Sequence, residues 1–519
     1  MSTPTPTYDA LAAHQLQLHR FGHVASIVHW DQAANMPPKG NEARAAALAE
    51  LAALMHRLRT DKTLADRIAR AEQEPLDELQ RANLREMRRD WHLANALPES
   101  LVQRRQMATS RCEHAWRTLR PANDWAGFVE TWKPVLAIAR EEAALLAAQT
   151  GLAKYDALMD RYEPGMTSAT LDRVFGEVRQ WLPGLIDRVI EGVKNGRDEI
   201  RELVSAEIDR VIDRQSRDKP VEPTGPFAIE KQRALCQRIV GLLGFDFDAG
   251  RMDVSAHPFC GGVPEDVRMT TRYREDEFLP ALMGTVHETG HGRYEQNRPR
   301  EWLGQPVSEA RSMAIHESQS LSFEMQLGGH PGFARAMAPL LAEHFGAQPA
   351  FEPANLHRLI TRVQRGLIRV DADEVTYPAH IILRYEIERP LIEGEIQAED
   401  IPALWDAKMR ELLHIDTRGN FKDGPLQDVH WPEALFGYFP CYSLGAMYAA
   451  QWFAAMRRAM PDLDVRIGAG DFAPVFDWLC EKIWTQASRW STDELAIRAS
   501  GEPLNPAHFK RHLEARYLG

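Results

Sequence analysis

One segment of the sequence has the residue types and spacing of a metal-dependent hydrolase. His287 and His291 are four positions apart, and Glu288 directly follows the first histidine. On a helix this spacing puts both imidazoles on one face, one turn apart, where both can reach one ion. Glu288 then lies beside them and can take a proton from water without being a ligand itself. The alternative is a charged helix that carries two surface histidines.

A third ligand is needed, because a catalytic zinc ion has three protein ligands and an open position for water. No histidine follows His291 at the short spacing of the extended H-E-x-x-H-x-x-G-x-x-H motif. The next predicted helical segment offers Glu309 and Glu317, with Glu324 just beyond. Glu317 lies 26 residues after His291 (317 − 291), which lets a second helix return antiparallel to the first. His316 points about 100° away from Glu317 and cannot share its role.

Helical patterns are expected to position these residues. From residue 8 to 150, apolar residues recur at helical spacing, as in the stripe that contains Leu84, Met87 and Trp91. The arginine-rich stretch 81–105 is interleaved with acidic residues, which is typical of a solvated helix face rather than of a nucleic-acid-binding surface. These patterns predict a mainly α-helical protein.

A short region of different character precedes the histidine motif. The stretches 251–255 and 267–273 are alternating and β-branched, and they predict a small sheet beside the active site. Helical patterns resume at Asp276, which we expect to cap the helix of the histidine motif, and Pro299 should lie beyond its end. We expect one domain over 1–519, with a helical N-terminal part to about residue 220 and a catalytic part after it.

Composition excludes several other classes of protein. The 519 residues carry a formal net charge of −12 without a basic tract, so neither nucleic acid nor a membrane surface is an expected partner. No apolar run is long enough to span a membrane, and the N-terminus does not resemble a signal peptide. The five cysteines are scattered and form no C-x-x-C pair. We therefore expect a reduced, cytoplasmic protein.

Short motifs are spread along nearly the whole chain. They are Trp30-Asp31 with Met36-Pro37, Tyr162-Glu-Pro-Gly165, His257-Pro-Phe, Asp266-x-Arg268-x-Thr270, His287-Glu-x-x-His291, His316-Glu317-Ser318, Ile368-Arg369-x-x-Ala372-Asp373 and Gly437-Tyr438-x-Pro440. Together they resemble the motifs of the thermostable metallocarboxypeptidase family (Taq carboxypeptidase type), and the last six fall in the family's order. Two cysteines, Cys260 and Cys441, stand where the family pattern has threonine.

The resemblance implies more than the spacing alone does. It implies a large helical metallopeptidase fold with a deep groove, and Glu317 as the third ligand of one Zn²⁺ per chain, with Co²⁺ as an alternative. It also implies a homodimer that releases single amino acids from the C-termini of peptides. A metal-bound water would then attack the peptide bond, with Glu288 as general base.

Other motif residues are candidates for contact with substrate. A free α-carboxylate is recognised well by a guanidinium, and Arg369 is the first candidate, with Arg268 second. Either arginine could instead pair with a nearby acid: Asp371, Asp373 or Glu374 for Arg369, and Asp266 for Arg268.

Two further motif residues could act during catalysis. Tyr438 could donate to the oxyanion of the tetrahedral intermediate, or be a packing residue. His257 could hydrogen-bond the substrate backbone or cap a strand, and Asp373 could orient a ligand histidine or form a salt bridge.

We interpret the chain as a metallocarboxypeptidase of peptides with a free C-terminus. Two alternatives stay open from sequence. One is an oligopeptidase or dipeptidase on a related helical scaffold, and the other is a helical binding protein that has lost its metal. The intact set of His287, Glu288, His291 and Glu317 argues against the second.

Overall fold

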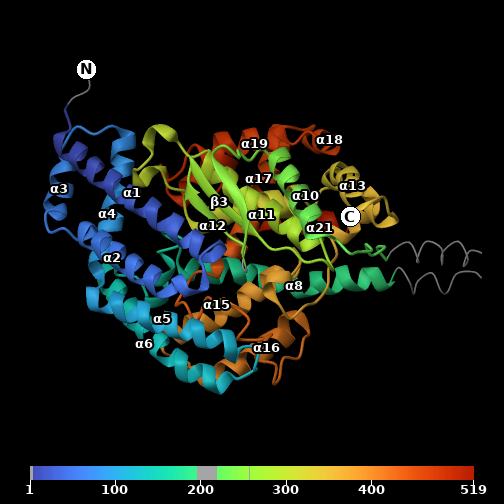
Figure 1. Ribbon diagram of the computed structural model, residues 1–519, viewed down its shortest axis with the longest axis horizontal. Helices are drawn as coiled ribbons and strands as arrows, with labels where there is room; N and C mark the ends of the chain where they lie inside the picture. Colours follow the sequence, from blue (N-terminus) through green and yellow to red (C-terminus); the bar gives the residue numbers. More distant parts are fainter. Residues whose placement is uncertain (1–3, 196–218, 256–257, 519) are drawn as a thin grey trace, which may run out of the picture. The chain divides into compact units, whose positions relative to one another are not determined.

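The computed structural model describes residues 4–195, 219–255 and 258–518, and its elements are labelled in Figure 1. The chain divides into two compact units, each assembled from three segments that are far apart in sequence. Unit 1 comprises residues 1–96, 224–347 and 452–504, and unit 2 comprises residues 97–223, 348–451 and 505–519. The His287–His291 motif therefore belongs to unit 1, whereas Arg369 and Tyr438 belong to unit 2.

Unit 1 contains a three-stranded sheet among helices. Tyr8, Leu64 and Ile68 of the first and third helices pack with Leu84 and Met87 in one hydrophobic cluster, which confirms the helical stripe expected there. The elements of unit 1 are α1 (Pro6–Ala34), α2 (Asn41–Arg59), α3 (Leu64–Ala71), α4 (Glu78–Ala96), α10 (Ile229–Leu242), β1 (Gly250–Val254), β2 (Cys260–Val263), β3 (Asp266–Thr271), α11 (Leu279–Gln296), α12 (Met313–Leu321), α13 (Pro331–Phe345), α18 (Leu463–Gly468), α19 (Ala473–Leu479) and α20 (Thr492–Ser500).

The small sheet confirms the prediction and adds a strand to it. β1 and β3 correspond to the two predicted stretches and pair in parallel, with Arg251 opposite Arg268. β2 pairs antiparallel with β3, so β3 is the central strand. Sequence alternation could not indicate β2, because two of its four residues are Gly261 and Gly262. Gly262 has a φ of +126°, and a Cβ there would collide with the carbonyl oxygen of Asp266.

Helix α11 carries the histidine motif and packs against β3 and α12 (Figure 1). It ends at Gln296, before Pro299, as expected. Its start differs from the prediction, because Phe278 occupies the N-cap position and makes no side-chain cap hydrogen bond. Asp276 does not cap the helix: its carboxylate accepts two hydrogen bonds from Arg274, at 3.0 and 2.6 Å.

Unit 2 consists of helices and the connections between them. Its elements are α5 (Glu99–Leu119), α6 (Trp125–Thr150), α7 (Lys154–Met159), α8 (Ser168–Asn195), α14 (Pro353–Ile360), α15 (Tyr377–Glu393), α16 (Ile401–Leu413) and α21 (Ala507–Tyr517). Helix α17 (Pro440–Ala459) begins in unit 2 and ends in unit 1. None of the helices in the described part of the chain is long and apolar enough to cross a membrane.

Candidate metal centre

Helix α11 presents the two histidines of the motif side by side. The ring centroids of His287 and His291 are 5.0 Å apart. Thr285 and Thr289 are fully buried, and the Thr289 hydroxyl donates to the carbonyl of Thr285 at 2.7 Å. The face of α11 that carries these threonines is therefore packed inside the unit, while the histidines stay partly exposed.

Glycine at position 290 lets a second helix approach α11 closely. A Cβ at Gly290 would lie 2.5 Å from the carbonyl oxygen of Gln319 and 2.6 Å from the Cα of Ser320, both on α12. Helix α12 starts at Met313, so Glu309 lies before this helix rather than on it, contrary to the expectation from sequence. The close crossing brings Glu317 of α12 to the two histidines.

Helix α12 is anchored on its other side by two buried tryptophans. The indole N–H of Trp452 donates to the hydroxyl of Ser318 at 3.0 Å, and that of Trp484 donates to the side chain of Gln319 at 2.8 Å. Because these residues directly follow Glu317, the two hydrogen bonds fix the part of the helix that carries this carboxylate.

The three side chains form a set that fits a metal ion. Glu317 Oε2 lies 3.4 Å from His291 Nε2 and 3.9 Å from His287 Nε2. One ligand atom of each residue lies within 4.8 Å of the others. Two ligands about 2.1 Å from a tetrahedral ion would be roughly 3.4 Å apart. The donor set of two imidazoles and one carboxylate is one that catalytic zinc uses.

The second nitrogen of each histidine has its own partner. His287 Nδ1 lies 2.7 Å from Glu324 Oε2, and His291 Nδ1 lies 2.6 Å from His316 Nδ1. His316 Nε2 is in turn 2.8 Å from Glu295 Oε1. If Nε2 of each histidine held a metal ion, Nδ1–H would donate to these partners, which would fix both the tautomer and the ring orientation.

Sequence reasoning did not assign Glu324 and Glu295 to these histidines. The sequence offers Glu324 only as a candidate ligand, and no pattern singles out Glu295. Glu324 lies in a π-helical turn, Ser322–Leu327, that directly follows α12. The π-helical turn interrupts the 3.6-residue period from which side-chain directions are inferred. The direction of the Glu324 side chain could therefore not be derived from the sequence. Glu295 lies one helical turn beyond His291, and residues at this spacing are neighbours on a helix surface. This spacing is the sequence feature that could have indicated its place near the histidines.

The carboxylate of Glu288 is buried beside this set. The residue is 6% exposed, and its Oε2 has no hydrogen-bond partner among the described residues. Burial raises the pKa of Glu288 to about 7, although the neighbouring His287 lowers it. Burial also raises the pKa of Glu317, but His287 and His291 outweigh it, and the pKa lies below its ordinary value. The two carboxylates therefore differ in basicity, and Glu288 is the one suited to exchange a proton near neutral pH.

Arg268 of β3 is held in place within unit 1. Its guanidinium donates to both oxygens of Asp266, at 2.5 and 3.0 Å, and lies over the ring of Trp30 at 4.5 Å. His23 Nε2 also lies 3.2 Å from Asp266. The pairing with Asp266 is the alternative that the sequence left open. His257, the other candidate near the sheet, lies outside the described residues.

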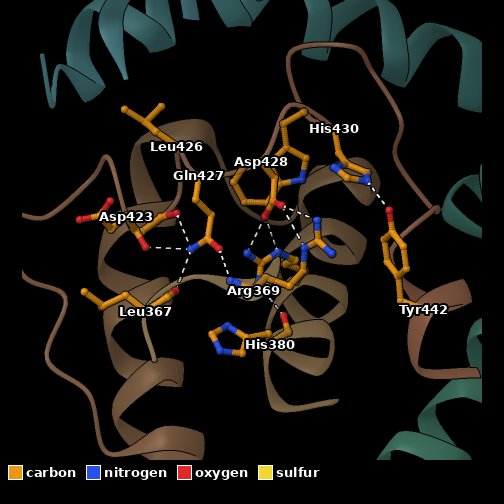
Figure 2. Close-up of polar contacts among 12 residues, drawn as sticks. Leu367, Arg369, His380, Asp423, Leu426, Gln427, Asp428, His430 and Tyr442 are labelled. Carbon is orange, nitrogen blue, oxygen red and sulfur yellow. Dashed lines mark hydrogen bonds and ion pairs between the residues drawn. The ribbon is translucent and has the colours of Figure 1, made fainter. Parts of the chain in front are cut away.

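Arg369 lies in a buried cluster of charges in unit 2, shown in Figure 2. Its Nε and Nη2 donate to Asp428 Oδ1 at 3.0 and 2.9 Å, and Arg384 donates to the other oxygen, Oδ2. Nη1 of Arg369 lies 3.3 Å from the hydroxyl of Tyr377, and the guanidinium lies over the ring of Tyr442 at 4.8 Å. Arg369 is therefore paired with Asp428 rather than with any of the three acids that follow it in sequence.

Neighbouring groups fix the position of this cluster (Figure 2). The side-chain amide of Gln427 accepts from the backbone N–H of Arg369 at 2.7 Å and donates to the carbonyls of Leu367 and Asp423. Asp373 accepts from the backbone N–H groups of its own loop, including those of Gln364 and Thr376, and so orders the loop.

Tyr438 lies in the turn before α17 and is surrounded by rings. Its ring centroid is 5.1 Å from that of Tyr162, 5.4 Å from that of Tyr442 and 5.6 Å from that of His430. His430 in turn lies 3.0 Å from the hydroxyl of Tyr442 (Figure 2). These contacts hold the ring of Tyr438 within unit 2.

Comparisons with known proteins agree along the whole chain. The profile of the family described as Carboxypeptidase Taq (M32) metallopeptidase matches residues 10–198 and 191–517. Thermostable carboxypeptidase 1 of Thermus thermophilus is 36% identical, over 99% of both chains, and carboxypeptidase 1 of Bacillus subtilis is 32% identical, over 96% of both. The structure of Trypanosoma cruzi metallocarboxypeptidase 1 is similar with a TM-score of 0.92 and 47% identity, and the match covers 99% of this chain and 100% of that one. The chain therefore belongs to the carboxypeptidase Taq (M32) family and is a metallocarboxypeptidase, an enzyme that hydrolyses peptides.

Proposed function

We propose that this enzyme releases single amino acids from the C-termini of peptides, with Zn²⁺ on His287, His291 and Glu317. Co²⁺ is an alternative metal for the same donors. The observation that carries the proposal is the convergence of these three side chains beside the buried carboxylate of Glu288, whose Oε2 has no hydrogen-bond partner among the described residues. A ligand set and a base held together in this way are the requirements of metal-assisted hydrolysis.

Glu288 is the proposed general base and acid. A divalent metal bound to this set supplies Lewis acidity, which acidifies water and polarises a carbonyl group. Glu288 takes a proton from the attacking water and delivers it to the departing amine. Glu324 and His316 keep the two histidines in the orientation that the ligand set requires.

Arg369 is the proposed anchor for the α-carboxylate of the peptide. What supports this role is the charge of its cluster, in which Arg369 and Arg384 share the single carboxylate of Asp428. Burial lowers the pKa of His380 and of His430 to about 3, so both stay neutral near pH 7. Among Arg369, Arg384, Asp428 and the two histidines, one positive charge is in excess, and a substrate carboxylate can neutralise it.

Further parts of the proposal concern residues and properties outside the metal set. We propose that Tyr438 donates a hydrogen bond to the oxyanion, and that Arg268 and His257 contact the peptide as secondary binding residues. The relatives are described as carboxypeptidases, and the enzyme is proposed to act, as a homodimer, on cytoplasmic peptides.

The test of this function is a time course with an unblocked synthetic peptide and zinc-loaded enzyme, followed by mass spectrometry. A ladder that shortens one residue at a time from the C-terminus is expected. Internal fragments or dipeptides would support the oligopeptidase alternative and overturn the proposal. The matched control is Glu288→Gln, which removes the base but no ligand. This variant should keep its metal and lose turnover, and near-native turnover with metal bound would remove Glu288 from its role.

A further inference from the structure

Glu388 on α15 is a fully buried carboxylate, and it accepts a hydrogen bond from the turn that carries Tyr438. Its Oε2 accepts from the backbone N–H of Gly437 at 3.1 Å and from the hydroxyl of Tyr155 at 3.1 Å. Its Oε1 accepts from the indole N–H of Trp431 at 2.8 Å. One side chain thus joins α15, α7 and both ends of the segment 431–437, all within unit 2.

Two features constrain the turn at Gly437. The φ of this residue is +83°, a conformation that favours glycine. A Cβ at this position would lie 2.8 Å from both the backbone nitrogen and the Cα of Met159, so the turn lies directly on the end of α7. Tyr155 is on the same helix, so Glu388 forms hydrogen bonds both to α7 and to the turn that packs against it.

Glu388 makes its contacts as a hydrogen-bond acceptor. Burial raises its pKa to about 7, while the donors Gly437, Trp431 and Tyr155 and the charge of Arg384 lower it. Without an acceptor at this place, the N–H groups of Gly437 and Trp431 would be buried and unpaired, which a protein interior tolerates poorly. The turn would then rearrange to find other partners.

We propose that Glu388 is a positioning residue that fixes the turn of Tyr438 in its catalytic orientation. The inference rests on the oxyanion role proposed above for Tyr438. Glu388, which belongs to none of the sequence motifs, would hold Tyr438 in the position for that role. The ring of Tyr438 packs against Tyr162, His430 and Tyr442. The backbone of the preceding residue, Gly437, is held by its hydrogen bond to Glu388. A displacement of the turn therefore moves the phenol away from the position that the proposed oxyanion role requires.

The test compares Glu388→Met with Glu388→Gln, in the zinc-loaded full-length enzyme. Methionine keeps the unbranched shape but accepts no strong hydrogen bond, so kcat should fall roughly 10- to 100-fold, with little change in KM or metal content. Glutamine keeps one carbonyl acceptor and should restore part of the loss. Amide hydrogen exchange in the segment 436–439 should speed up in Glu388→Met and stay slower in Glu388→Gln.

Glu374→Met is the matched control for a merely structural effect. Glu374 is also a buried carboxylate of unit 2, and it contacts His512, Arg516 and Tyr517 on α21. Its loss should lower the melting temperature while leaving kcat and exchange at 436–439 near those of the wild type. A similar fall of kcat in both methionine variants would overturn the inference.

A double-mutant cycle separates this inference from the proposed role of Tyr438. If Glu388 acts through Tyr438, Glu388→Met should cost little further kcat in a Tyr438→Phe background. Additive losses would overturn the positioning role while leaving that of Tyr438 intact. If Tyr438→Phe alone has native kcat, the oxyanion role itself fails and the catalytic consequence of Glu388 fails with it.

Discussion

Substitution of Gly290 by alanine tests whether the close crossing of α11 and α12 builds the metal set. The new Cβ would lie 2.5 Å from a backbone oxygen of Gln319, whereas ordinary contact begins at 3.4 Å. The nearest atoms belong to the backbone of α12, so the helices must separate by roughly 0.9 Å to admit the methyl group. Glu317 lies two residues before Gln319 on the displaced helix and moves with it.

A shift of this size exceeds what a metal site accommodates, because ligand distances must hold within about 0.2 Å. We expect Gly290→Ala to weaken metal binding roughly 10- to 100-fold, as disturbed supporting residues typically do. Overpacking should also lower the free energy of unfolding by roughly 1–3 kcal/mol. Metal retention in a series of chelator concentrations measures the first effect, and denaturant unfolding measures the second.

Gly284→Ala is the matched control on the same helix. A Cβ at Gly284 meets no atom within 4 Å, so this variant gains helix propensity without a clash. It should keep native metal affinity and gain up to about 1 kcal/mol of stability. The reasoning is refuted if Gly290→Ala folds, binds metal as tightly as Gly284→Ala and retains native activity. The position of Glu317 would then not depend on the glycine.

Three further predictions concern single carboxylates and one arginine. Glu317→Ala should lose its metal on dialysis, and Glu324→Ala should bind metal roughly 10- to 100-fold more weakly. Glu309→Ala should retain its metal. Equal metal retention in all three variants would identify a different third ligand. Arg369→Ala should lose roughly 10- to 100-fold in kcat/KM on free-acid peptides but much less on amidated ones, and equal losses on both would refute the anchor. Burial raises the pKa of Glu374, but cations on α21 outweigh it and hold the pKa at about 2. Its contribution to stability, on the order of 3 kcal/mol, should be present above pH 4–5 and lost as the pH falls toward 2, so unfolding curves of Glu374→Gln and wild type should converge there.

The sequence was informative wherever local geometry decides the outcome. The i, i+4 spacing of His287 and His291 is a property of any α-helix, and the sheet followed from the alternation in 251–255 and 267–273. Asp276 was predicted as a cap because its residue type favours that position. Its carboxylate is instead engaged by Arg274, two residues earlier, and a contact of this kind depends on the loop rather than on propensity.

Long-range partners could not be read from the sequence. The acids that the sequence offers as partners of Arg369 lie two to five residues away, yet its partner Asp428 lies 59 residues further along, in a segment without regular structure. Glu388 belongs to no motif, and no pattern in the sequence singles it out. Both cases depend on how helices and connections of unit 2 pack, and neither charge nor spacing along the chain specifies that packing.

The proposed ligand set would also act on the folded chain as a cross-link. Between His291 and Glu317 the chain leaves α11, passes through residues 297–312 with only short 3₁₀ turns, and enters α12. An ion held by His291 and Glu317 would close this loop of about 26 residues in the folded protein. Because it would bind the folded chain and not the unfolded one, its binding free energy would add to the stability of the fold. Removal of the ion should first expose residues 297–312 to proteolysis, before either unit unfolds as a whole.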